Sequence, residues 1–174
     1  MEQLGLDFTV VEPSLVGEVN SGRPEEAVLG NALAKAKDVA EKHGEAVVIS
    51  ADTVVVLGDR VFGKPVSASE AEEMLILLQG RTHRVMTGIA VVHAASGTVE
   101  SGVVETRVRM LPTTSEKIRA YVGTGEPMDK AGGYAIQGLG AVLVDEIEGC
   151  YHNVVGLPLS RLAILLKRFG IRIP

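Results

Sequence analysis

The chain is poor in the side chains that several common classes of protein require. It has one cysteine, Cys150, which excludes an intramolecular disulfide and fits a reducing compartment. It has no tryptophan and only 3% aromatic residues, so the stacking platforms of single-strand nucleic-acid binders are poorly represented. Lys and Arg number 17 against 22 Asp and Glu, and the net charge of −5 argues against a protein that binds duplex DNA or RNA.

Long apolar runs are also missing. None is long enough to span a bilayer, and the first residues lack the basic-then-apolar layout of a signal peptide. The 174 residues, 46% of them hydrophobic, predict a single globular domain over residues 1–174. We therefore expect a cytoplasmic protein with no membrane or nucleic-acid partner.

The patterning of apolar residues predicts an α/β fold. Steps of three and four residues indicate helices, and β-branched stretches indicate buried strands. Capping boxes at residues 67–70 and 113–116 predict two helix starts, and a Gly-Asp pair at 58–59 predicts a tight hairpin. The expected helices cover residues 24–43, 67–79, 113–122 and 157–166, and the expected strands cover 46–57, 60–62, 85–93, 99–110 and 141–147.

Asp52 is the most unusual residue, because it interrupts an aliphatic strand. A buried carboxylate costs several kcal/mol in desolvation unless a cation or a hydrogen-bond donor meets it. One interpretation is a general base or metal ligand at the end of a strand. The other is a structural acid at a bulge, satisfied by backbone amides.

Three lysines are candidates for binding an anion. Lys64 lies between Gly63 and Pro65 in a rigid turn that can present its ammonium to a phosphate, although most such lysines are simply solvated. Lys35 and Lys37 share the first helix, where a solvated basic face is the simpler interpretation. The sequence has no G-x-x-x-x-G-K-[ST] motif, which argues against a P-loop nucleotide hydrolase.

The glycine-bearing segment 126–138 predicts a ligand-binding loop rather than a plain connector. Lys130 can neutralise phosphate charge, and the amide of Gln137 can both donate to and accept from a nucleobase edge. The four histidines and Cys150 lack the spacing of a zinc site.

Six groups of residues, in order along almost the whole chain, resemble the Maf family of nucleoside triphosphate pyrophosphatases. They are Leu33, Ala34 and Lys37; residues 50–55 (SADTVV); residues 63–65 (GKP); residues 80–83 with 87–88 (GRTH, TG); residues 125–134 with 136–138 (GEPMDKAGGY, IQG); and residues 153–158 (NVVGLP). Each is modest alone, and together they are specific.

The resemblance implies a Maf/inosine-triphosphatase-like fold, a mixed twisted sheet flanked by helices with a cleft between two lobes, often in a homodimer. It implies hydrolysis of dTTP and UTP, including modified pyrimidine triphosphates in a house-cleaning role, to the monophosphate and pyrophosphate with Mg²⁺ or Mn²⁺.

The same resemblance implies roles for individual residues. Asp52 is expected to accept the proton and, with Glu18, to hold the metal. The remaining positions are expected to bind substrate: Lys37, Lys64 and Lys130 the triphosphate, and Thr53 and Gln137 the base. These last two distinguish the dTTP/UTP branch from a sister branch that acts on 7-methyl-GTP.

One departure from the family pattern stands out. Members begin with a strand and a turn of the form A-S-x-S-P-R-R, which has no counterpart in these 174 residues. Three explanations compete: a misassigned start, a truncated chain, or a shortened homologue that binds nucleotide weakly without turnover. The first two are favoured because the other site positions match. The alternatives to the pyrimidine enzyme are thus a non-catalytic nucleotide-binding module and a 7-methyl-GTP pyrophosphatase.

Overall fold

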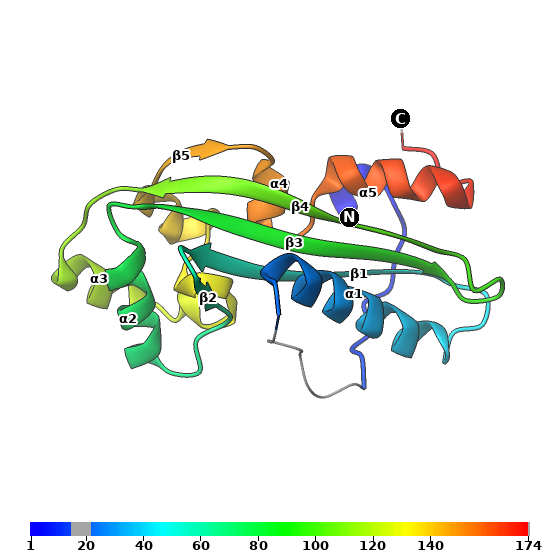
Figure 1. The fold of residues 1–174 in the computed structure, drawn as a ribbon, viewed down its shortest axis with the longest axis horizontal. Coiled ribbons are helices and arrows are strands. Elements are labelled where there is room, and N and C mark those ends of the chain that lie inside the picture. The colour runs from blue at the N-terminus through cyan, green and yellow to red at the C-terminus, as the bar shows by residue number, and fades with distance from the viewer. Residues whose placement is uncertain (15–21, 174) are drawn as a thin grey trace. The chain divides into compact units, whose positions relative to one another are not determined.

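A computed structural model describes residues 1–14 and 22–173, and its elements form the α/β arrangement that the sequence predicts (Figure 1). The strand order in the sheet is β2-β1-β3-β4-β5. The helices are α1 (Pro24–Ala40), α2 (Ala68–Leu78), α3 (Ser115–Val122), α4 (Tyr151–Val155) and α5 (Leu159–Leu166). The strands are β1 (Val47–Leu57), β2 (Arg60–Phe62), β3 (Thr82–His93), β4 (Val99–Met110) and β5 (Val144–Glu148). Short 3-10 turns cover Glu2–Leu4, Glu126–Asp129, Ala131–Gly133, Gly138–Leu143 and Lys167–Phe169.

The chain divides into two compact units, and each long strand contributes to both. Unit 1 contains residues 1–52, 87–104 and 157–174, and unit 2 contains residues 53–86 and 105–156. The single domain expected from the chain length stays a prediction.

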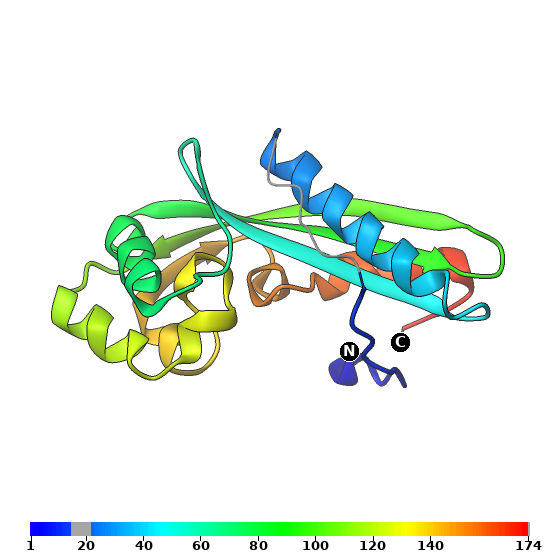
Figure 2. The ribbon, with the colours of Figure 1, turned by 90° about the horizontal axis from the view of Figure 1, so that it is seen from below.

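In unit 1, helices α1 and α5 cover opposite faces of the strands, because β3 alternates its side chains between them (Figures 1 and 2). Ala90 and Val92 pack with α1, whereas Ile89 and Val91 pack with α5. The approach of α1 is close: a Cβ added at Gly88 would lie 2.3 Å from the carbonyl oxygen of Val28. Pro24 stands in the first turn of α1, where its fixed φ favours the helix and its missing N–H costs nothing.

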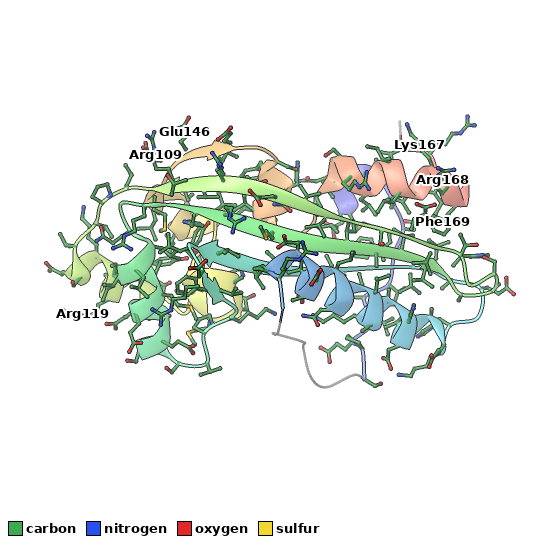
Figure 3. All side chains as sticks on the ribbon, viewed as in Figure 1. Arg109, Arg119, Glu146, Lys167, Arg168 and Phe169 are labelled. Atoms are coloured by element: carbon green, nitrogen blue, oxygen red, sulfur yellow. The ribbon has the colours of Figure 1, made fainter. Side chains whose placement is uncertain are left out.

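In unit 2, α2 and α3 pack on the ends of β1, β3 and β4 around a core that includes Leu75, Ile118 and Tyr121. At the exposed side of this unit, Arg109 on β4 is opposite Glu146 on β5 (Figure 3). The Arg109 guanidinium lies 2.7 Å from the Glu146 carboxylate and 2.9 Å from that of Asp145. Such a cross-strand ion pair fixes the register of an edge strand more than it adds stability.

Most of the elements expected from the sequence are confirmed. The Gly58-Asp59 turn joins β1 to β2 with Leu57 opposite Arg60, as a two-residue hairpin requires. Ser67 caps α2, since its Oγ accepts a hydrogen bond from the amide of Glu70 at 3.2 Å.

Several details differ from expectation: α1 ends at Ala40 rather than at residue 43, and β3 begins at Thr82 rather than at residue 85. The cap of α3 is Thr114 rather than Thr113, because its Oγ1 is the one that accepts from Lys117 N. Strand β5 begins at Val144, since a 3-10 turn occupies the preceding Gly138–Leu143. Helix α4 is a single short turn with too few residues to show a period, and the sequence did not predict it.

Within the described residues, no helix combines the length and apolar character needed to cross a membrane.

The contact between α1 and β3 predicts a sharp difference between two glycines of unit 1. Gly88→Ala should lower the free energy of unfolding by about 1–3 kcal/mol, because its new methyl group meets the backbone at Val28. Gly30→Ala, in α1 with open space around it, should instead raise stability by about 0.5–1 kcal/mol. Urea unfolding of both variants measures this, and equal effects would contradict the close approach.

Candidate functional site

In unit 1, the carboxylate of Asp52 is held by two side chains of helix α1. Lys35 Nζ lies 2.6 Å from Oδ1, and Asn31 Nδ2 donates to Oδ2 at 3.1 Å. Asn31 and Lys35 are four positions apart and therefore lie on the same face of the helix. The same helix buries Ala32 and Ala36 against the sheet, and this packing fixes how far Asn31 and Lys35 lie from β1.

This contact shows which groups satisfy the buried carboxylate of Asp52, namely two side chains of α1. The residue is 8% exposed and Lys35 26% exposed, so the charges neutralise one another in a partly dehydrated place. A carboxylate in such a position is stable only while its partner remains. Both of its oxygens are thereby oriented by side chains.

The structure gives less information on the other two site residues predicted in unit 1, Lys37 and Glu18. Lys37 is exposed in the last turn of α1, and Lys35, two positions earlier, makes the contact with Asp52. Glu18 lies outside the described residues. Asn31 was not predicted as a site residue, although a period of 3.6 residues places Asn31 and Lys35 beside the buried alanines.

In unit 2, the Gly-Lys-Pro turn and the glycine-bearing loop are joined by their backbones. The amide of Gly132 donates to the carbonyl oxygen of Gly63 at 2.9 Å. Gly132 has a φ of 72°, and a Cβ there would lie 2.9 Å from a methyl group of Val55. Glycine is therefore required on both conformational and steric grounds.

Two of the predicted lysines face one acid in this unit. Lys130 forms an ion pair with its neighbour Asp129. The hydrogen bond from Lys130 holds the pKa of Asp129 below its ordinary value, and the charge of Lys64 lowers it further. The charges of Lys64 and Lys130 thus both act on Asp129, a residue that was not singled out from the sequence.

The two residues predicted to select the base are both in unit 2. Thr53 follows Asp52 in β1 and is partly buried. Gln137 is exposed on extended backbone just before the 3-10 turn Gly138–Leu143.

A buried histidine also supports the glycine-bearing loop. His83 on β3 is 2% exposed, and its Nε2 lies 2.7 Å from the hydroxyl of Tyr134 in the loop. Burial lowers the pKa of His83 from 6.5 to about 4, so the ring is neutral at pH 7. Among residues 1–14 and 22–173, no three His, Cys, Asp or Glu side chains cluster as a metal site.

Comparison with known proteins agrees with this pattern of residues. The family model described as Maf-like protein matches residues 1–169. The chain belongs to the Maf family. The three relatives described below align with 97–99% of it.

Three relatives illustrate the similarity, and each is named dTTP/UTP pyrophosphatase. The protein of Dictyoglomus turgidum is 49% identical over 97% of this chain and 88% of its own length. That of Pelotomaculum thermopropionicum is 49% identical over 99% of this chain and 91% of its own length. That of Halalkalibacterium halodurans is 46% identical over 98% and 89%, respectively.

The Lys35–Asp52 pair in this Maf chain predicts a strong energetic coupling. Lys35→Met should destabilise the fold by about 2–3 kcal/mol, somewhat less than for a fully buried pair, because it leaves Asp52 without its ammonium. Adding Asp52→Asn should recover more than about 1 kcal/mol of that loss. The matched control Lys37→Met, on the exposed side of the helix, should change stability by less than about 0.5 kcal/mol. Additive effects of Lys35→Met and Asp52→Asn in denaturant unfolding would contradict the pairing.

The buried His83 predicts a pH-dependent contribution to stability. Between its ordinary pKa of 6.5 and its folded value of about 4, the unfolded chain binds more protons than the folded one. The contribution of His83 is therefore complete above pH 6.5 and is lost as the pH falls toward 4. The stability difference between the wild type and His83→Gln should shrink by about 3 kcal/mol between pH 7 and pH 4. A difference that stays constant over this range would show that His83 is not held neutral.

Proposed function

We propose that this Maf-family chain hydrolyses dTTP and UTP to the monophosphate and pyrophosphate. The names of its relatives support the substrate class, at 46–49% identity over nearly their full length. The observation that carries the chemistry is the buried carboxylate of Asp52, oriented by Lys35 and Asn31.

In the proposed reaction, Asp52 is the general base. Its carboxylate takes a proton from a water molecule while the water oxygen forms a bond to the α-phosphorus. The bond between that phosphorus and the bridging oxygen breaks, and pyrophosphate leaves in line with the attack. Asn31 keeps the carboxylate oriented by donating to its second oxygen.

Lys35 also suits the triphosphate. A lysine ammonium is a cation with three donors, and that of Lys35 lies beside the carboxylate of Asp52. The ammonium can bind phosphate oxygens and offset the charge that builds up on them in the transition state. We propose Lys35 for this role beside Lys37, for which the family resemblance remains the argument.

Asp52 and Glu18 are the residues that would hold a divalent cation, Mg²⁺ or Mn²⁺. The described residues contain no complete cage of three acidic or imidazole ligands. A cage is not needed, because Mg²⁺ is commonly held by one or two carboxylates together with the phosphates of its substrate. When bound, the cation supplies charge neutralisation of the phosphate oxygens.

The remaining contacts are proposed for unit 2. Lys64 and Lys130 share Asp129 and are assigned to the phosphate chain. Gln137, exposed at the start of its 3-10 turn, and Thr53 are assigned to the pyrimidine. The family resemblance also leads us to propose a homodimer.

Pyrophosphate release tests the function directly. The protein, incubated with Mg²⁺ or Mn²⁺, should release pyrophosphate from dTTP and UTP and much less from CTP or 7-methyl-GTP. Asp52→Asn should reduce kcat by about 10²–10⁴-fold, the usual contribution of a general base. Asp59→Asn, an exposed acid in the β1–β2 turn, is the matched control and should leave kcat unchanged.

Other outcomes of this experiment would favour the alternative functions. Nucleotide-dependent thermal stabilisation without pyrophosphate release would identify a binding module rather than an enzyme. Turnover of 7-methyl-GTP in preference to UTP would move the chain to the sister branch. Full activity of Asp52→Asn would remove Asp52 from the chemistry.

A further inference from the structure

One acid of unit 2, Glu126, takes no part in the proposed chemistry and yet accepts three hydrogen bonds. Its Oε1 accepts from the hydroxyl of Tyr121 at 2.9 Å and from the amide of Gly140 at 2.8 Å. Its Oε2 accepts from the amide of Leu139 at 3.0 Å. The two amides are 13 and 14 positions further along the chain, so this carboxylate closes the loop from one end to the other.

The carboxylate of Glu126 accepts these hydrogen bonds as a charged group. The amides of Leu139 and Gly140 hold the pKa of Glu126 below its ordinary value, and Tyr121 contributes in the same direction. The carboxylate is therefore ionised at neutral pH, and hydrogen bonds to an ionised acceptor are stronger than those between neutral groups.

Tyr121 ties a second point of the loop to the same carboxylate. Its hydroxyl accepts from the buried amide of Ala135 at 3.1 Å while it donates to Glu126. Burial raises the pKa of Tyr121, and the neighbouring carboxylate raises it further, so the hydroxyl keeps the proton that it donates.

Glycines at positions 138 and 140 allow the backbone of the loop to approach the side chains of Glu126 and Tyr121 closely. A Cβ at Gly138 would lie 2.6 Å from Oε2 of Glu126, and one at Gly140 would lie 2.5 Å from the Tyr121 hydroxyl. Gly138 also has a φ of 70°, which other residues rarely adopt. Side chains at these positions would push the backbone away from the carboxylate.

Gln137 lies between the anchored positions. Ala135, two residues before it, is held by Tyr121, and Leu139, two residues after it, is held by Glu126. The backbone on both sides is thus fixed, while the side chain of Gln137 is exposed. A recognition group that is held in place before binding costs less conformational entropy when the ligand arrives.

We propose that Glu126 is a positioning residue for base selection: through Tyr121 and the amides of Leu139 and Gly140 it holds the segment that presents Gln137 to the pyrimidine. This inference rests on the assignment of Gln137 to the base in the proposed function. Glu126 itself is not assigned any contact with the substrate.

The test compares the binding of two pyrimidine nucleotides, so that it does not depend on turnover. Dissociation constants for the α,β-methylene analogues of UTP and CTP are measured by calorimetry for the wild type, Glu126→Gln and Gln137→Ala. Glu126→Gln keeps the shape of the side chain but points an amide NH₂ toward backbone donors. Its UTP/CTP selectivity should fall about tenfold, the effect of one well-placed hydrogen bond, and approach that of Gln137→Ala.

The double variant separates positioning from a general structural role. In the Gln137→Ala background, Glu126→Gln should leave the selectivity ratio unchanged, because the group that it positions is gone. Tyr121→Phe, which keeps both amide contacts of Glu126, should reduce the ratio less than Glu126→Gln does. The control Glu116→Gln, exposed on α3, should leave the ratio as in the wild type.

The inference is overturned if Glu126→Gln keeps the UTP/CTP selectivity of the wild type, or if it loses affinity equally for both nucleotides. It is also overturned if the wild type binds the two analogues with the same affinity. If Glu126→Gln does not fold, Tyr121→Phe and the shorter Glu126→Asp carry the same comparison. Failure of the proposed hydrolysis is recognised separately, because it abolishes pyrophosphate release from UTP without changing the binding ratio.

Discussion

The contact between Asp52 and helix α1 is the interaction on which unit 1 depends. A carboxylate that is 8% exposed needs a cation and a donor, and Lys35 and Asn31 supply them from one helical face. This requirement fixes the rotation of α1 about its axis, and the small residues Ala32, Ala36 and Gly88 allow the helix to come close enough. The same contact that stabilises the packing therefore also orients the proposed base.

In unit 2, the main constraint is the ordering of a loop that is rich in glycine. Glycine gives the backbone the positive φ and the close approaches that the loop needs, but it also increases the entropy lost on ordering. The loop is fixed by hydrogen bonds at separate points: Gly132 on Gly63, Tyr134 on His83, and the amides around Gln137 on Tyr121 and Glu126. All of these anchors are side chains or backbone of unit 2, so the loop geometry is a property of that unit.

The sequence predicted those features that depend on local chemistry. The cap at Ser67, the hairpin at residues 58–59 and the need of Asp52 for a partner all follow from a few neighbouring residues. The identity of that partner did not follow, because Lys35 and Lys37 differ only in helical phase and the resemblance selected Lys37. Glu126 was included only as part of the segment 126–138, since its role arises from amides 13 and 14 positions away. Contacts between distant residues set these features, and a local pattern does not encode them.

The Lys35–Asp52 pair also imposes a condition on the proposed catalysis. The Lys35 ammonium lies 2.6 Å from the carboxylate and is therefore engaged with Asp52 before substrate binds. A bound triphosphate carries several negative charges and competes for the same ammonium. In the proposed mechanism Lys35 turns toward the phosphates, and its ion pair with Asp52 weakens as the distance between the two charges grows. Asn31, which donates to the second carboxylate oxygen, keeps the proposed base oriented during this exchange.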